Sequence, residues 1–143
     1  MTVKSILEEK GRNVITLRPD EAISKAIKVL AEKKIGALVV TSDSGSIRGI
    51  LSERDIVRWI AAKGASILDR PLSEAMTTNV KLCNENHTVN ELMEIMTKGR
   101  FRHLPVEKDG RLDGIISIGD VVKRRIEDIE READEIRNYI ATG

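Results

Sequence analysis

Two short stretches of the sequence combine a glycine, a serine and an aspartate at one fixed spacing. Residues 49–55 are GILSERD and residues 114–120 are GIISIGD, so both follow the pattern Gly-apolar-apolar-Ser-x-x-Asp. A serine followed by an acid three residues later is typical of a helix N-cap. The same groups can bind a ligand, because a helix amino terminus attracts phosphate and a nearby acid accepts both hydroxyls of a ribose. Recurrence of the pattern favours the ligand site, and we expect Gly49 and Gly114 to let that ligand approach the backbone.

Patterns of catalytic or metal chemistry are missing elsewhere in the sequence. It contains no Ser/His/Asp order, no phosphate-binding GxxxxGK[ST] loop and no GxGxxG fingerprint. His103 has no second histidine nearby, and Cys83 is the single cysteine, so neither a metal cluster nor a disulfide framework is expected. We therefore predict a protein that is not an enzyme and needs no metal or cofactor, with Cys83 as a buried structural thiol.

The motif lies within a longer internal repeat. Residues 45–60 match residues 110–125 at six of 16 positions when offset by 65. Upstream the offset becomes 66, and the extra residue falls in a turn, where insertions are tolerated. Two copies of one unit therefore fill most of the chain.

Each unit is predicted to contain a strand, a helix, two strands and a second helix. Apolar spacing and turn residues give the boundaries, with Asp20 as one helix cap and the Thr88/Glu91 capping box as another. The expected elements are strands Val14–Arg18, Ala37–Thr41, Ile47–Leu51, His103–Glu107 and Leu112–Ser117; helices over 22–31 and after Thr88; helices starting near Glu53 and Gly119; and a short connector helix, Leu72–Met76.

A unit of about 60 residues exposes too much surface to be stable alone. We expect an α/β fold of the α+β type, in which the two sheets pack together as a pseudo-twofold body with two equivalent clefts. The predicted boundaries are 1–64 for the first unit with an N-terminal helix, 65–127 for the second unit with its connector, and 128–143 for a C-terminal helix extension.

Composition excludes several classes of function. The chain has 143 residues and a formal net charge of +1, which argues against a broad nucleic-acid surface. Its amino terminus lacks a signal pattern, and no apolar run reaches the roughly 18 residues of a membrane span. We expect a soluble, cytoplasmic protein that does not enter the membrane.

With these motifs in order and duplicated, residues 3–127 resemble the cystathionine-β-synthase (CBS) domain pair. The resemblance also rests on the strand at 102–106, RHLPV, and on the segment at 75–77, AMT. It implies a regulatory module that binds adenosine-containing ligands such as AMP, ADP, ATP, NAD(H) or S-adenosylmethionine, with AMP expected first. It also implies homodimers and signalling to a protein partner whose identity the sequence does not reveal.

Carried over by position, the resemblance implies two unequal clefts that each combine one unit's aspartate with the other unit's first strand. The cleft at Asp120 is the favoured one, because more basic residues flank it and Glu53 weakens the other. Its expected residues are Asp120, Ser117, Ile118, Gly119, Arg102, His103, Val14, Ile15, Thr16, Ile35, Gly36 and Ala37. Those of the second cleft are Asp55, Ser52, Arg54, Asn79, Val80, Lys81 and Phe101.

The C-terminal stretch predicts a long, charged helix with one apolar face. Its apolar residues advance by 4, 3, 4, 3 and 4 positions, which is a heptad-like spacing: Val122, Ile126, Ile129, Ala133, Ile136 and Ile140. A homodimer contact is the leading explanation. The alternative is packing against the chain's own N-terminal residues Val3, Ile6 and Leu7.

Two other functions remain open at this point. One is a scaffold or oligomerisation module whose clefts hold no ligand, although serine and aspartate are present in both motifs. The other is an RNA-associated regulator that uses the arginines near residue 100 and the basic residues at 123–125. Nucleic acid is the less expected partner because the chain's charges balance.

Overall fold

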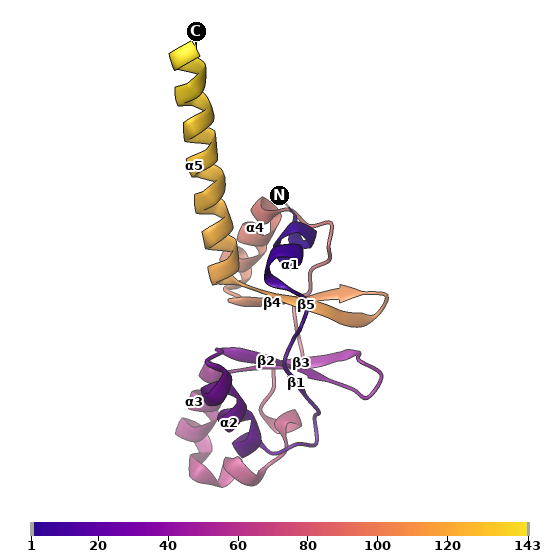
Figure 1. The fold of residues 1–143 in the computed structure, drawn as a ribbon. Coiled ribbons are helices and arrows are strands. Elements are labelled where there is room, and N and C mark those ends of the chain that lie inside the picture. Colours follow the sequence, from indigo (N-terminus) through magenta and orange to yellow (C-terminus); the bar gives the residue numbers. More distant parts are fainter. Residues whose placement is uncertain (1, 143) are drawn as a thin grey trace.

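The computed structural model describes residues 2–142. Met1 and Gly143, which the sequence-based boundaries include, lie outside the described residues. The structure is a mixed α+β fold with a long C-terminal helix, as expected from the sequence (Figure 1). In chain order the elements are α1 (Val3–Lys10), β1 (Thr16–Leu17), α2 (Ile23–Lys33), β2 (Ala37–Thr41), β3 (Ile47–Ser52), α3 (Glu53–Lys63), the 3-10 turns η1 (Gly64–Asp69) and η2 (Leu72–Glu74), α4 (Val89–Gly99), β4 (His103–Lys108), β5 (Arg111–Ser117) and α5 (Ile118–Thr142).

Each unit contains an antiparallel hairpin, and the two hairpins have equivalent registers. Ala37 at the start of β2 pairs with Ser52, and His103 at the start of β4 pairs with Ser117. The serine of each motif therefore ends the second hairpin strand, where the chain enters a helix. The Asp109-Gly110 turn has positive φ at both residues, 52° and 76°, which matches the right-handed twist of a hairpin.

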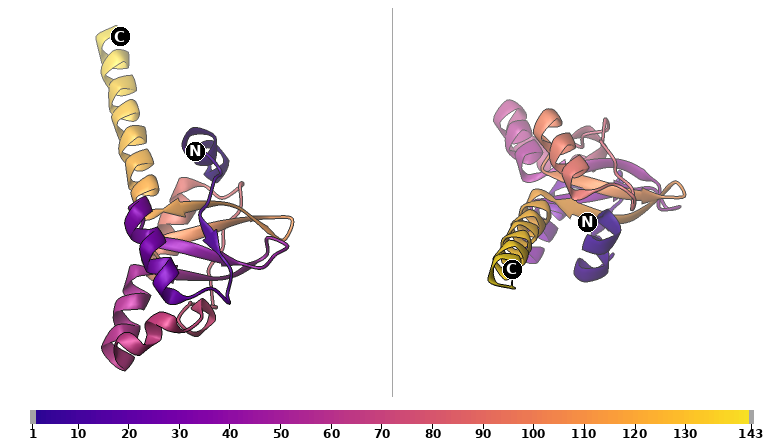
Figure 2. Two further views of the ribbon diagram at one scale, coloured as in Figure 1. Left: turned by 60° about the horizontal axis from the view of Figure 1, so that its bottom comes forward. Right: turned by 90° about the horizontal axis from the view of Figure 1, so that it is seen from above.

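The two hairpins face one another between outer helices (Figures 1 and 2). Every residue of β2 is buried, so both faces of this strand are covered. Leu38 and Val40 belong to the core of the first unit, whereas Val39, at 0% exposure, lies on the opposite face of the strand. The turns are also joined, because the Leu112 amide donates to the Gly45 carbonyl at 3.1 Å.

The segment that precedes each unit packs into the other unit. Helix α1 contributes Val3, Ile6 and Leu7 to the second core, although the sequence-based boundaries grouped this helix with the first unit. The connector contributes Ile67 and Leu72 to the first core. This exchange buries the apolar face of each short segment and joins the two small units into one body.

Three local expectations are wrong or incomplete. The expected strand Val14–Arg18 is only Thr16–Leu17, which pairs parallel with β2, and its counterpart is a single bridge between Cys83 and Val106. The cap of α2 is Ala22 without a side-chain hydrogen bond, instead of Asp20. The expected Leu72–Met76 helix is the short turn η2. Cys83 is buried as predicted, and burial raises the pKa of its thiol to about 12.

Helix α5 extends well past the body (Figure 1). Val121 is its one buried residue, and it joins the second core. Within residues 2–142, no helix combines the length and the apolarity needed to cross a membrane.

Candidate functional site

Both motifs form the helix caps expected from their spacing. Ser52 Oγ accepts a hydrogen bond from the Asp55 amide at 3.2 Å, and Asp55 Oδ2 accepts one from the Ser52 amide at 3.0 Å. In the second unit the Asp120 amide donates to Ser117 Oγ at 3.1 Å, and the Ser117 amide donates to Asp120 Oδ2 at 2.8 Å. The capping interpretation is therefore confirmed, and it fixes both aspartates at helix amino termini.

A second backbone bond ties each of these helices to the start of the hairpin. The Glu53 amide donates to the Gly36 carbonyl at 3.0 Å, and the Ile118 amide donates to the Arg102 carbonyl at 2.8 Å. These bonds satisfy a first-turn amide that has no partner within its own helix. They also place the residues before β2 and β4 beside the motif of the same unit.

The motif glycines lie against protein rather than facing an open ligand site, so the role expected for them is wrong. A Cβ on Gly49 would lie 2.8 Å from the Thr77 carbonyl oxygen, and one on Gly114 would lie 2.7 Å from Leu7 Cδ2. Gly49 therefore makes room for the connector, which pairs with β3 through reciprocal Ile50 and Thr77 backbone bonds of 2.9 and 3.0 Å. Gly114 makes room for α1.

A cleft of about 320 Å³ lies between the two units at Asp55. Its volume is within the range of small-molecule sites. The first unit supplies the start of α3, and the second supplies the segment at 79–81 and the loop before β4. All seven residues expected in the second cleft line it: Ser52, Arg54, Asp55, Asn79, Val80, Lys81 and Phe101.

Three residues expected in the other cleft also line this one. They are Gly36, Arg102 and His103. A Cβ on Gly36 would lie 3.6 Å from His103 Cε1, so the starts of the two hairpins meet here. Sequence reasoning did not assign Thr77 and Gly99 to a site, although Thr77 belongs to the AMT segment that contributed to the resemblance.

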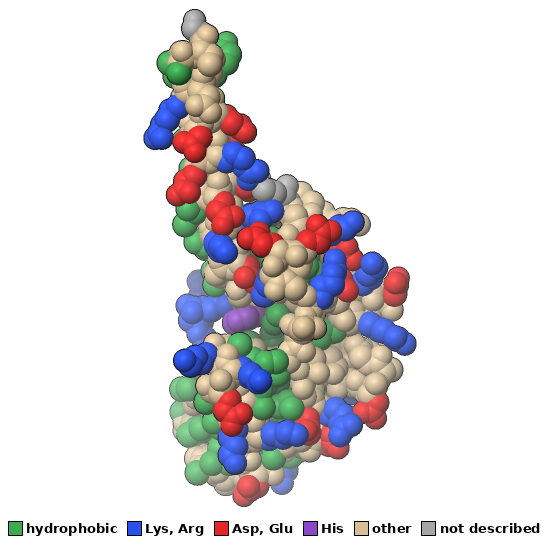
Figure 3. Space-filling view, in the orientation of Figure 1, with side chains coloured by type: hydrophobic (Ala, Val, Ile, Leu, Met, Phe, Trp, Pro, Cys, Tyr) green, Lys and Arg blue, Asp and Glu red, His purple; other side chains and the backbone are tan. Residues whose placement is uncertain are grey.

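The cleft at Asp55 carries an excess of positive charge. Five of its lining residues are cationic and two are acidic, Glu53 and Asp55. Within residues 2–142, none of the five cations forms an ion pair with a carboxylate, in contrast to most arginines elsewhere on the surface. They are Arg54, Arg58, Lys81, Arg100 and Arg102. Figure 3 shows Lys and Arg side chains bordering the hollow between the halves. This arrangement suits an anion.

Asp120 has a different environment, because Lys10 from α1 reaches its carboxylate. Lys10 Nζ lies 2.5 Å from Asp120 Oδ2 and donates to the Ile115 carbonyl at 2.8 Å. Burial, the largest influence, opposes ionisation of Asp120, but the Lys10 and Ser117 hydrogen bonds outweigh it and lower the pKa. The hollow beside Asp120 is lined by Ile6, Glu9, Lys10, Lys123, Arg124 and Glu127.

The remaining residues expected around Asp120 do not line that hollow. Ile118 is 45% exposed at the start of α5, and Ala37 is buried at the start of β2. Thr16 lies in β1, and Ile35 packs on the first core. Val14 and Ile15 are partly buried just before β1, Ser117 caps α5, and Gly119 follows in its first turn.

His103 lies where the two sites approach each other. Burial, followed by the charge of Lys10, lowers its pKa, while Asp120 and Glu53 act in the opposite direction. One charged group from each motif, Glu53 and Asp120, therefore influences the pKa of the imidazole. Across the described part of the chain, no group of three or more His, Cys, Asp or Glu residues is placed to hold a metal ion.

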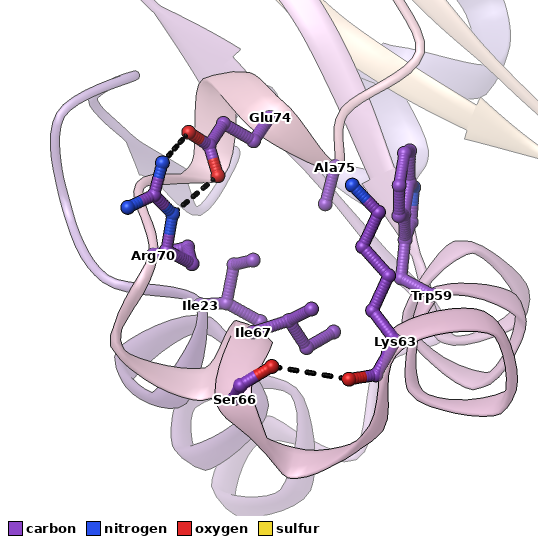
Figure 4. A pocket seen from close by; sticks show the side chains of 8 residues that line it. All are labelled: Ile23, Trp59, Lys63, Ser66, Ile67, Arg70, Glu74 and Ala75. Atoms are coloured by element: carbon purple, nitrogen blue, oxygen red, sulfur yellow. Dashed lines mark hydrogen bonds and ion pairs between the residues drawn. The ribbon is translucent and has the colours of Figure 1, made fainter.

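A third hollow, of about 490 Å³, lies away from both motifs between α3 and the connector (Figure 4). Lys63 Nζ is 5.0 Å from the centroid of the Trp59 ring, and Arg70 forms an ion pair with Glu74 on the opposite side. Arg58 of the Asp55 cleft and Trp59 of this hollow are consecutive residues of α3, so one helix touches both.

Comparison with known proteins gives consistent matches along the chain. The model of the CBS domain matches residues 3–62 and 72–127. The crystal structure of the CBS-domain containing protein ATU1752 from Agrobacterium tumefaciens is 54% identical, with a TM-score of 0.84 over 87% of this chain and 99% of that one. The mitochondrial CBS domain-containing protein CBSX3 of Arabidopsis thaliana is 31% identical over 99% of this chain and 73% of its own length.

A further solved structure contains ligands. It is the CBS domain pair of protein MJ0100 in complex with 5′-methylthioadenosine and S-adenosyl-L-methionine. It is 26% identical to this chain, with a TM-score of 0.79 over 90% of this chain and 98% of that one.

Proposed function

Since the chain belongs to the CBS-domain family, we propose that it is a regulatory module, not an enzyme, that binds an adenine nucleotide in the cleft at Asp55. The observation that carries the proposal is the convergence of both units on this cleft. Asp55 comes from the first unit and the segment at 79–81 comes from the second. Five cations also line the cleft, and among residues 2–142 none of them has a carboxylate partner. The adenosine compounds bound by the MJ0100 pair support the same class of ligand.

Each group in the cleft has a role that follows from its chemistry. The Asp55 carboxylate accepts the ribose hydroxyls, with Oδ2 also bound to the cap and Oδ1 3.5 Å from the Thr77 hydroxyl. The phosphate lies near the start of α3, where the helix dipole and the arginines favour negative charge. Ile50, Val80 and Phe101 supply apolar surface for the adenine.

This proposal reverses the ranking of the two clefts expected from the sequence. Lys10 already holds the carboxylate of Asp120, and a ribose would have to displace that ion pair. In addition, Arg102 and His103, which were expected beside Asp120, line the Asp55 cleft. One nucleotide per chain is therefore the expected stoichiometry.

The charge of the cleft also selects among adenosine ligands. AMP, ATP and NAD(H) carry phosphate, which the five cations attract. S-adenosylmethionine carries a sulfonium cation, which they repel. We expect AMP as the basic ligand, with ATP and NAD(H) as competitors, and S-adenosylmethionine as the weakest binder of the set.

Signalling follows from a cleft that joins two units. A nucleotide that contacts both units favours the arrangement of the halves in which it binds best, and a partner protein that distinguishes the arrangements responds to it. Helix α3 extends from the cleft to Trp59, so the single tryptophan reports movement of this helix. We expect the protein to act as a homodimer.

Isothermal titration with AMP tests the site. Asp55→Asn keeps an oxygen for the helix cap but removes the charge and one acceptor, so affinity should fall by about 10- to 100-fold. Asp120→Asn is the matched control, since it makes the same change at the other motif, and it should alter affinity less than about twofold. Co-purified nucleotide identified by mass spectrometry provides an independent measurement.

Three results would reject the proposal. The first is equal loss of affinity in both variants, because it would mean that the two motifs contribute alike. The second is a wild-type protein that binds no adenine nucleotide, as a ligand-free scaffold would. The third is tighter binding of S-adenosylmethionine than of AMP, which would contradict the charge argument.

A further inference from the structure

The apolar stripe of α5 is exposed along its whole length. Its five large residues are between 48% and 71% exposed, and hydrophobic side chains are visible at intervals along the helix in Figure 3. They alternate in steps of four and three residues, which keeps them on one face of a supercoiled helix. They are Val122, Ile126, Ile129, Ile136 and Ile140, with Ala133 at the remaining position.

The chain's own N-terminal helix does not cover this stripe. Val3, Ile6 and Leu7 are at most 5% exposed, and they are buried in the second core together with Val121. Their apolar surface is already used, so the alternative explanation of the stripe is wrong. Since α5 is anchored in the core at Val121, the costly first turn of the helix is already formed when a partner binds.

The charges beside the stripe identify the partner and its direction. In a parallel, in-register pair of identical helices, the residue directly before Ile126 or Ala133 lies near the residue five places further along the other helix. Arg125 then faces Glu130 of the partner subunit, and Glu132 faces Arg137 of the partner subunit. Both pairs are of opposite charge, and the symmetry of the dimer creates each pair twice.

The antiparallel arrangement brings like charges together instead. In an antiparallel pair of helices, the two stripes face each other when Ile129 lies opposite Ala133 of the partner subunit. Glu130 and Glu132 then each lie beside their own copies, and Lys123 lies beside Arg137 of the partner subunit. Like charges at these positions oppose association.

From this pattern we propose that α5 forms a parallel, in-register coiled coil with α5 of a second copy of the chain. The stripe supplies the apolar seam, and the flanking charges select the direction. The intrachain pair of Arg137 with Asp134, at 3.4 Å and on the surface, leaves the guanidinium able to reach a partner helix. The arrangement places the two bodies at the same end of the coil.

Disulfide cross-linking tests the direction. Ile136→Cys places two thiols opposite each other in a parallel pair, within reach of a disulfide, whereas an antiparallel pair sets Ile136 opposite Ile126. Mild oxidation should therefore cross-link the Ile136→Cys variant to itself. Asn138→Cys is the matched control, because residue 138 lies on the outer face and should remain uncross-linked. Cys83 is buried and does not interfere.

Charge exchange tests the specificity. Glu132→Lys faces Arg137 of the partner subunit with a like charge and should weaken the dimer about fivefold in sedimentation experiments. Adding Arg137→Glu should restore the dimer, and truncation after Arg125 should weaken it further than either single change. A monomeric wild-type protein at micromolar concentration overturns the proposal. Cross-linking only in a mixture of Ile126→Cys and Ile136→Cys proteins also overturns it.

Discussion

Gly49 illustrates how the motif holds the two units together, and its replacement by alanine gives a sharp prediction. A methyl group at this position would lie 2.8 Å from the Thr77 carbonyl oxygen and 2.9 Å from the sulfur of Met76. The carbonyl belongs to the backbone that pairs with Ile50, so it can move only if that pairing loosens. The connector would shift away from β3, and Thr77 would shift within the Asp55 cleft.

The expected cost follows from these contacts. Overpacking of a tight site destabilises a protein by about 1–3 kcal/mol. Alanine also makes the unfolded chain less flexible than glycine does, which stabilises the folded state by about 0.4–1 kcal/mol. A net loss of about 1–2 kcal/mol in the free energy of unfolding corresponds to a decrease of roughly 3–6 °C in Tm for a chain of this size. Nucleotide affinity should also fall, because Thr77 lines the cleft.

Thermal and urea unfolding measure this cost, and Gly119→Ala is the matched control. A Cβ on Gly119 would have no neighbour closer than Ser117 Oγ at 3.6 Å, so this variant gains helix propensity without a clash. Its Tm should rise by about 1–2 °C. A Gly49→Ala protein that is as stable as the wild type would refute the argument that the glycine accommodates the connector.

Two further predictions concern charge. Lys10→Met should lower the free energy of unfolding by about 0.5–1 kcal/mol at neutral pH. Because the folded pKa of Asp120 is lowered, this difference between variant and wild type exists above about pH 4 and should vanish as acid protonates Asp120. Urea titrations that show the same difference in strong acid would contradict the prediction. His103 has a lowered folded pKa, so the unfolded state binds its proton first and stability should fall as the pH drops below about 6.5. His103→Gln should reduce that slope in urea unfolding at a series of pH values, and an unchanged slope would exclude His103 as its source.

The sequence predicted the elements well where local chemistry decides them. The hairpin strand at 37–41 has the predicted bounds, and the Thr88/Glu91 capping box forms as expected. Repetition of the motif also predicted two equivalent units. These features depend on side-chain periodicity, turn residues and caps, all of which act over a few residues.

Local rules failed where a distant segment competes for the same groups. Asp20 has the right type for a cap, yet α2 begins after Ala22, where the connector pairs with the chain and the Ile23 amide donates to the Arg70 carbonyl at 3.0 Å. The strand at 14–18 was shortened because only Thr16 and Leu17 meet β2. Neither outcome is visible in the sequence around these residues.

The sequence by itself determined the repeated unit, the positions of both aspartates at helix starts and the apolar stripe of α5. Only the tertiary structure distinguished the surroundings of the two aspartates. Lys10 and Asp120 are separated by 110 residues, and the exchange of α1 into the second unit brings them to 2.5 Å. That contact gives two similar motifs different environments, because a carboxylate already paired with a lysine is less available to a ligand than one in a cleft whose cations have no carboxylate partner among residues 2–142.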